Sequence, residues 1–288
     1  EACESVRRQV LGLRDPETGV WTGELAASAL STALAAVALQ EEGGDDRLLA
    51  EAGASWLAAH ANGDGGWGDT PGSVSNVSAT LIATAALRRV SPGRRATLQR
   101  AEAWTVARTG TLAPDAVVRA LGRIYGEDRT FAVPILAFLA MCGEDGAAWR
   151  SVPPLPFLMA LLPQRAYRFF RLQVVSYALP ALIAVGLCRH VCVARGSRRA
   201  AWGRLFAGPL LRRLERLQPS HGGFLDAIPL TAFVCLALRH AGYGHHAVVQ
   251  KGLDFLRRSA RPDGSWAIDS NLRTWVTTQA TRALLAGG

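Results

Sequence analysis

Hydrophobic and polar positions repeat along the chain in a fixed order. A turn with glycine and an aromatic residue comes first, then a polar spacer, then an apolar stretch rich in Ala, Leu and Thr. Self-similarity of this kind predicts a repeat architecture. Five segments follow the order, the third of them in degenerate form: residues 18–39, 64–87, 125–143, 221–238 and 263–285.

Several of these turns are preceded by an amphipathic stretch, as in LLRRLERLQ, whose leucines at 210, 211, 214 and 217 share one helical face. The stretch after each turn is apolar nearly all round, which is typical of a buried helix. Helix pairs repeated in this way form an open solenoid or a closed toroid. Burial of the second helices favours closure, so we predict an all-α fold: one α/α barrel of inner and outer helices over residues 1–288.

The segment DGGWGDTPGSVSN, which begins at Asp64, raises the question of an active site. A phosphate-binding loop needs a strand before its glycines and a helix directly after them, and neither is expected here. Asp64 and Asp69 also suggest the paired carboxylates of a toroid glycosidase. Because the turn recurs, we interpret it as a structural joint in which Trp67 packs against a neighbouring repeat.

Residues 151–200 differ from the repeats. Prolines divide the segment, and residues 174–188 form an uncharged run that is too short for a comfortable membrane span. An apolar patch ringed by arginines is typical of monotopic membrane proteins, although the run also fits one more inner helix. The flanking arginines are Arg165, Arg168, Arg171, Arg189, Arg195, Arg198 and Arg199.

Composition narrows the classes of function. The net charge is +9, but no basic stripe interleaved with aromatics is present, so nucleic acid is not an expected partner. The five cysteines are scattered in apolar runs, as expected for buried thiols in a reducing compartment, and Cys188 and Cys192 are only a weak zinc signal. We expect no cofactor and no metal. The first residue is not Met, and we expect the sequence to be a piece of a longer protein.

The repeats resemble those of the prenyltransferase and terpenoid cyclase superfamily, and most closely squalene-hopene cyclases. The motifs occur in the expected order over essentially the whole chain: VWTGELAASALSTA, DGGWGDTPGSVSN, GEDRTFAVPIL, VPPLPF, RLQVVSYALPALIAVG and PDGSWAIDSN. Two departures are the missing Gln before DGGW and Phe224 in place of Trp. The resemblance implies a bacterial enzyme with two α-barrels, bound peripherally to the cytoplasmic surface of the inner membrane. It identifies this chain as the N-terminal companion half.

In the resembling family, an Asp-X-Asp-Asp motif on the other barrel protonates a terminal alkene. Such a step needs a strong acid in a dry pocket, naturally at a loop-to-helix junction. The junctions of the first, second, fourth and fifth repeats carry no Asp cluster, so the chain alone is expected to be inactive. A second barrel after residue 288 or on a separate chain would supply the acid. The resemblance implies cavity-lining roles for Trp149, Leu272, Arg273, Trp275 and Thr277, against the alternative of ordinary packing.

The expected partners are a lipid or polyprenyl substrate, a membrane surface and the second barrel. Two other functions remain open. The chain could be a non-catalytic lipid-binding or interaction module that kept the barrel and lost the chemistry. It could also be a protein prenyltransferase β-like subunit, a zinc enzyme, with Cys235 on a suitable helix but no matching His or second Asp nearby.

Overall fold

The computed structural model describes residues 2–22, 25–126, 129–143, 146–163, 165, 178–194 and 198–287. Most of these residues are helical, and apart from helices they form two isolated β-bridges. The α-helices are α1 (Ala2–Gly12), α2 (Ala29–Gln40), α3 (Asp46–Ala59), α4 (Val77–Val90), α5 (Arg95–Thr109), α6 (Pro114–Tyr125), α7 (Arg129–Cys142), α9 (Leu179–Val193), α10 (Arg198–Leu217), α11 (Ile228–His240), α12 (Ala247–Arg258) and α13 (Arg273–Ala286). Short 3₁₀ turns are η1 (Gly146–Arg150), η2 (Phe157–Leu161) and η4 (Phe224–Asp226).

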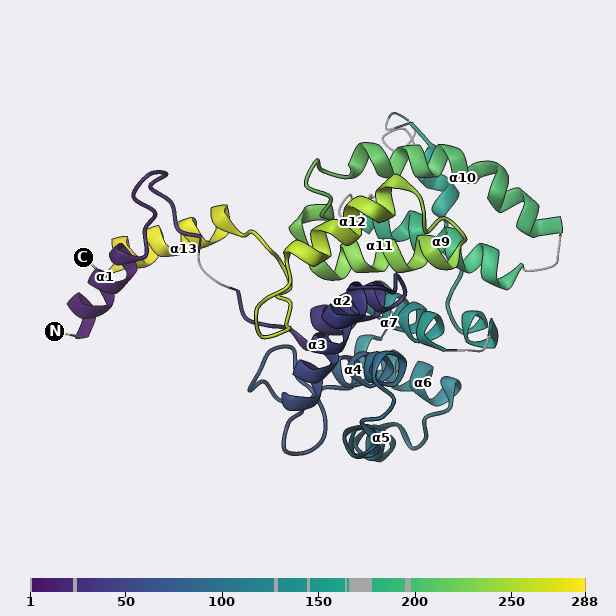
Figure 1. Cartoon of the computed structure of the whole chain (residues 1–288), viewed down its shortest axis with the longest axis horizontal. Helices are drawn as coiled ribbons and strands as arrows, with labels where there is room; N and C mark the ends of the chain where they lie inside the picture. The colour runs from purple at the N-terminus through teal and green to yellow at the C-terminus, as the bar shows by residue number, and fades with distance from the viewer. Residues whose placement is uncertain are drawn as a thin grey trace.

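The inner helices α2, α4, α7, α9 and α11 pack side by side and return to their starting point. Helix α2 contacts both α4 and α11, α4 contacts α7, α7 contacts α9, and α9 contacts α11 (Figure 1). The ring is therefore closed, which confirms the predicted all-α barrel and excludes an open solenoid. Ten of the twelve residues of α2 are buried, because its small side chains let neighbouring helices approach on every side.

Outer helices cover the ring. Helix α3 packs on α2, α5 on α4, α10 on α9 and α12 on α11, while α6 lies beside α7. Their amphipathic sequences explain this position, because each buries one face and leaves the other to solvent. The leucines Leu210, Leu211 and Leu214 of α10 are buried as their spacing predicts. The turns η1 and η2 pack against α9, and η2 also contacts α10.

The glycine–aromatic turns are joints between outer and inner helices. In the second repeat, the Trp67 backbone N–H donates to Thr80 Oγ1 of α4 at 3.0 Å, and its indole Nε1 donates to the Leu57 carbonyl of α3 at 2.9 Å. Trp67 is only 1% exposed. Phe224 keeps the first of these bonds, from its N–H to Thr231 Oγ1 at 2.9 Å. This geometry agrees with the interpretation of the 64–87 segment as a structural joint.

The fifth turn pairs with a different helix from the one expected. The Trp266 N–H donates to Thr32 Oγ1 of α2 at 3.0 Å, and the Trp266 carbonyl accepts from the Ser28 N–H at 2.9 Å. The C-terminal turn thus docks on the N-terminal inner helix and closes the ring. The expectation that the helix after this turn is an inner helix is wrong, since α13 has no buried residues. Its place in the ring is taken by α2.

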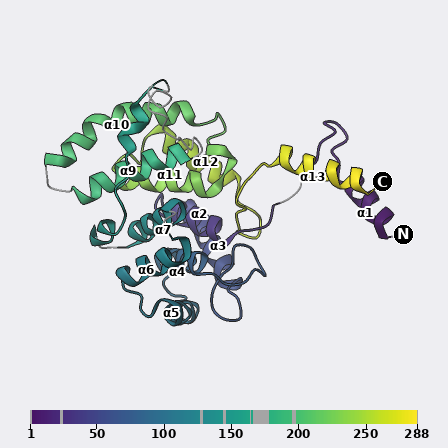
Figure 2. The same ribbon diagram turned by 180° about the vertical axis from the view of Figure 1, so that it is seen from behind.

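Helices α1 and α13 lie together outside the ring, and both chain ends lie at the end of this pair that points away from the ring (Figures 1 and 2). The turn after α1 repeats the joint: the Trp21 N–H donates to Thr277 Oγ1 at 3.0 Å, and Trp21 Nε1 donates to the Val10 carbonyl at 2.6 Å. We call residues 2–22 and 272–287 the arm. The fifth turn therefore pairs with α2, the helix that follows the first turn, and the first turn pairs with α13, the helix that follows the fifth.

The ring-closing joint gives a stability prediction. Thr32→Val keeps the shape of the side chain but leaves the buried Trp266 N–H without its acceptor, so we expect a loss of about 1–3 kcal/mol of unfolding free energy. Urea unfolding followed by circular dichroism measures it. Thr278→Val, on the exposed side of α13, is the control and should change stability by less than about 0.5 kcal/mol. Equal stabilities of the two variants would contradict the joint.

Candidate functional site

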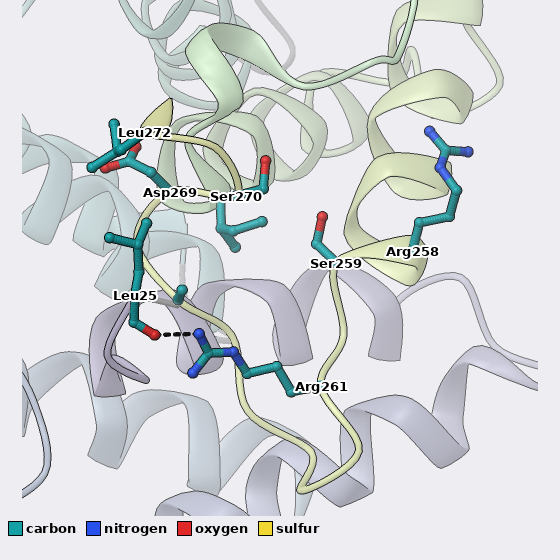
Figure 3. Close-up of a pocket in the computed structure, with 9 residues that line it drawn as sticks. Leu25, Arg258, Ser259, Arg261, Asp269, Ser270 and Leu272 are labelled. Carbon is teal, nitrogen blue, oxygen red and sulfur yellow. Dashed lines mark hydrogen bonds between the residues drawn. The ribbon is translucent and has the colours of Figure 1, made fainter. Parts of the chain in front are cut away.

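A cavity of about 300 Å³ lies where the arm leaves the ring. It is formed by the end of α12, the turn that follows, the start of α11 and the segment before α2 (Figure 3). Its lining residues are Leu25, Ile228, Arg258, Ser259, Arg261, Ala267, Asp269, Ser270 and Leu272.

Two loop segments are bonded together at this cavity. The Ile228 N–H donates to the Ile268 carbonyl at 2.9 Å, and the Ser270 N–H donates to the Asp226 carbonyl at 2.9 Å. Leu225 and Asp226 adopt positive φ angles of 55° and 56°. Two consecutive non-glycine residues in the left-handed region are uncommon, and the surrounding hydrogen bonds hold them there.

Charged groups surround the cavity. Arg261 donates to the Leu25 carbonyl (Figure 3). Arg258 donates to the His221 carbonyl at 2.8 Å. Burial raises the pKa of Asp269, and the nearby Asp226 carboxylate raises it further. The site therefore combines arginine donors with a carboxyl group that holds its proton to higher pH than a free aspartate does. Its charged lining is unlike the dry surroundings that protonation of an alkene requires.

Sequence reasoning missed Asp226 and Asp269. They lie in different repeats, and although Asp269 belongs to the motif PDGSWAIDSN, nothing in the sequence brings it close to Asp226. Their proximity follows from pairing of the fourth and fifth turns, which the structure shows as the bridge between Ala227 and Asp269.

The predicted lining residues divide into two groups. Trp149 is 3% exposed and lies in the hydrophobic core of the ring, in η1. The others lie at the start of α13, away from Trp149: Leu272 lines the cavity, Arg273 is exposed, and Trp275 is 58% exposed. Thr277 accepts the Trp21 N–H bond of the arm. The substrate-lining role of these residues stays a prediction.

Asp64 and Asp69 bind different partners within the joint. Asp64 accepts hydrogen bonds from Ser75 Oγ at 2.7 Å, from the Gly66 N–H at 3.0 Å and from Trp104 Nε1 at 2.7 Å. The bond from Ser75 is the largest cause that lowers the pKa of Asp64. Asp69 accepts from Asn76 Nδ2 at 2.9 Å. Both carboxylates fasten the loop to its neighbours, and the glycosidase alternative gains no support.

Of the cysteines expected to be buried, Cys188 and Cys235 are buried, Cys142 and Cys192 are partly buried, and Cys3 is exposed. Burial raises the pKa of the Cys235 thiol to about 12 and raises that of Cys142 further still. The sulfur atoms of Cys188 and Cys192 lie 3.9 Å apart on α9. In the described part of the chain, no three His, Cys, Asp or Glu side chains gather closely enough to hold a metal ion.

Comparison with known proteins identifies the class to which this barrel belongs. Residues 4–200 match the family described as "Squalene-hopene cyclase N-terminal domain". Since the match extends over more than half of the chain, the chain belongs to this family. A structure titled "Crystal structure of a protein from Actinoplanes" is 18% identical to this chain. Its alignment covers 92% of this chain and 83% of that chain, with a TM-score of 0.36. No curated protein matches the chain.

The Asp269 carboxyl group gives a pH prediction. Its pKa is raised by folding, so the folded state binds this proton more tightly than the unfolded chain does, and the associated stability is lost as pH rises through the folded pKa. The stability of Asp269→Asn relative to the wild type should therefore rise between about pH 4 and about pH 7. Denaturant unfolding at both pH values measures it.

Asp64→Asn is a control of opposite sign. The pKa of Asp64 is lowered by folding, so the wild-type carboxylate stabilises the fold above its unfolded pKa. The relative stability of this variant should fall as pH rises. A flat or falling curve for Asp269→Asn would contradict the assignment of its pKa shift.

Proposed function

We propose that the chain is the companion barrel of a class II terpenoid cyclase acting on squalene or a related polyprenyl chain. Its role is to help enclose the hydrophobic cavity in which the substrate cyclises. The catalytic acid belongs to a second barrel, on the same or a separate chain. The observation that carries this proposal is membership of the cyclase N-terminal domain family, with a closed α/α ring to match.

The loop-to-helix joints support a structural role for this half. The residues that precede α2, α4 and α11 are Ser28, Asn76 and Ala227, and each inner helix then presents a threonine to the turn. Ser28 and Asn76 use their side chains as helix caps, bonding the N–H groups of Ser31 and Ala79. A carboxylic acid for alkene protonation is therefore expected from another barrel.

The substrate cavity is proposed to lie between the two barrels, because the inner helices of this ring fill its centre with side chains. The start of α13 is the part of the arm available for lining it. Trp275 would present an aromatic face to a carbocation, an interaction worth about 1–2 kcal/mol in a dry site. Leu272, Arg273 and Thr277 would flank it, whereas Trp149 would act by supporting the ring.

Membrane attachment is part of the proposal. Leu158 and Leu162, at the start of the 151–200 segment, are 44% and 39% exposed, and Arg165 is exposed beside them in sequence. We propose that these side chains enter one leaflet at the inner membrane surface on the cytoplasmic side. Residues 166–177, with Arg168 and Arg171, and Arg195 lie outside the described residues. Among the helices that are described, none is long and apolar enough to span a bilayer.

Incubation with squalene tests the catalytic assignment. The chain alone should give no cyclised product, and the chain combined with an Asp-X-Asp-Asp barrel should give one. Trp275→Ala should then lower product formation by roughly ten-fold, whereas Leu48→Ala, on the exposed face of α3, should not. Product from this chain alone would overturn the assignment of the acid to the second barrel. Squalene binding without product in either mixture would favour a lipid-binding module.

Vesicle flotation tests membrane attachment. The double variant Leu158→Ser and Leu162→Ser should weaken binding to anionic phospholipid vesicles by roughly ten-fold, because two apolar side chains lose their burial. Leu48→Ser, which alters an exposed leucine on α3, is the matched control. Binding that is equal in all three proteins would count against this surface.

A further inference from the structure

The loops of the ring share a close backbone contact with the outer helix of the next repeat. In the loops of the second, fourth and fifth repeats, the glycine two residues before the aromatic residue has a positive φ angle, and a Cβ placed there would lie 3.0 Å or closer to a backbone carbonyl oxygen. Gly65 meets Arg100 of α5, Gly222 meets Lys251 of α12, and Gly264 meets Ala52 of α3. Glycine is needed at these positions both for the turn and for the approach.

The three accepting helices carry the same pattern. The residue directly after the contacted one is small, and an aromatic residue follows three positions after the small one. These pairs are Ala101 and Trp104 in α5, Gly53 and Trp56 in α3, and Gly252 and Phe255 in α12. The small residue permits close packing, and the aromatic residue covers the loop.

The aromatic residues of the accepting helices contact the loops directly. Trp104 Nε1 donates to Asp64 Oδ2 at 2.7 Å. Burial raises the pKa of Asp263, but hydrogen bonds from Ser265, the charge of Arg261 and, as the smallest contribution, a hydrogen bond from Trp56 lower it below its ordinary value. Asp64 and Asp263 hold the same position in their loops, three residues before the tryptophan. The accepting helix therefore fits the loop through a small–x–x–aromatic pattern, and in two of the three loops an aspartate accepts a hydrogen bond from the aromatic residue, whereas His221 lies near Phe255 in the third.

The arm has the same loop, but no helix among the described residues accepts it. Gly19 lies two residues before Trp21 and has a φ angle of +71°. The three nearest atoms that a Cβ there would meet all belong to the Arg14 side chain, and Arg14 Nε donates to the Gly19 carbonyl at 2.8 Å. In the ring, arginines of the next outer helix supply such bonds, as Arg100 does to Gly63 at 2.7 Å. The flexible Arg14 side chain thus fills the space that an outer helix occupies beside the loops of the ring.

We propose that the Gly19–Trp21 loop is the docking site for the outer helix of a further helix-loop-helix repeat, one that carries the small–x–x–aromatic pattern. Neither α1 nor α13 has a buried residue, so the arm lacks the neighbours that every described ring helix has. In a second copy of this chain, α3, α5 and α12 are covered by their own loops. The occupant is therefore a repeat of the second barrel. The identification of the occupant as part of the second barrel rests on the proposed function. The docking itself does not require any cyclase reaction.

A helical peptide probes this site on the full chain. The probe has the sequence 95–109 of α5, with a hydrocarbon link between positions 99 and 103 on its exposed side and a fluorescent label. Anisotropy should show saturable binding, and the peptide with Ala101→Leu should bind at least roughly ten-fold more weakly because the backbones no longer approach. Absence of saturable binding up to about 1 mM, or equal binding of both peptides, would overturn the proposal.

Variants of the chain separate docking from loop damage. Gly19→Val should abolish binding, whereas Gly43→Val should retain it, since Gly43 has a similar φ angle of +82° and no neighbour within 4 Å. Thr18→Asp places a carboxylate where Asp64 and Asp263 lie in their loops, so it should tighten binding roughly five-fold. Unchanged affinity in both Gly19→Val and Thr18→Asp would overturn the proposal.

Two further results keep the inference distinct from the proposed function. Peptide docking with no cyclised squalene in the presence of the second barrel would leave the docking site intact and remove the cyclase assignment. Sedimentation of the chain alone should show a monomer. A dimer that Gly19→Val dissociates would replace the proposed occupant with a second copy.

Discussion

The ring depends on one recurring hydrogen bond, from the backbone N–H of an aromatic residue in a turn to a threonine hydroxyl in the first turn of an inner helix. Trp67, Phe224 and Trp266 all make it, at 2.9–3.0 Å, and all three are buried. A buried N–H without an acceptor costs about 1–3 kcal/mol, so each turn is held to a helix that offers a threonine hydroxyl. Hydrophobic burial gathers the helices, and this bond fastens each turn to one of them.

At the fifth turn the hydrogen bond alone does not decide which helix is accepted. Both α2 and α13 present a threonine at the required place, Thr32 and Thr277, and each is bonded to the tryptophan of the other's repeat. The inner surface explains the outcome. Helix α2 is apolar and small on every side, whereas α13 contains polar and charged residues such as Arg273 and Gln279 that a packed ring would leave without water.

The sequence predicts the helix-loop-helix units and the closed all-α ring, because glycine–aromatic turns and apolar second helices are local signals. It also predicts a structural role for Asp64, since the recurring turn argues against a unique site. It does not predict the exchange between the first and fifth repeats, because both helices carry a threonine at the required place and each pairing joins residues that are 234 or 256 positions apart. The cavity near Asp269 escapes prediction for the same reason: its walls come from residues that meet only after the ring closes.

Closure through Trp266 and Thr32 also constrains how the chain acquires its structure. Helix α2 is made early during synthesis, yet two of its covering elements, α11 and the turn after α12, come some 200 residues later in the sequence. Contacts of such long range form slowly, because the chain must close a large loop before it gains any stability from them. Until then α2 exposes an apolar, alanine-rich surface to solvent. During that long interval the exposed face of α2 makes a newly synthesised chain prone to aggregation.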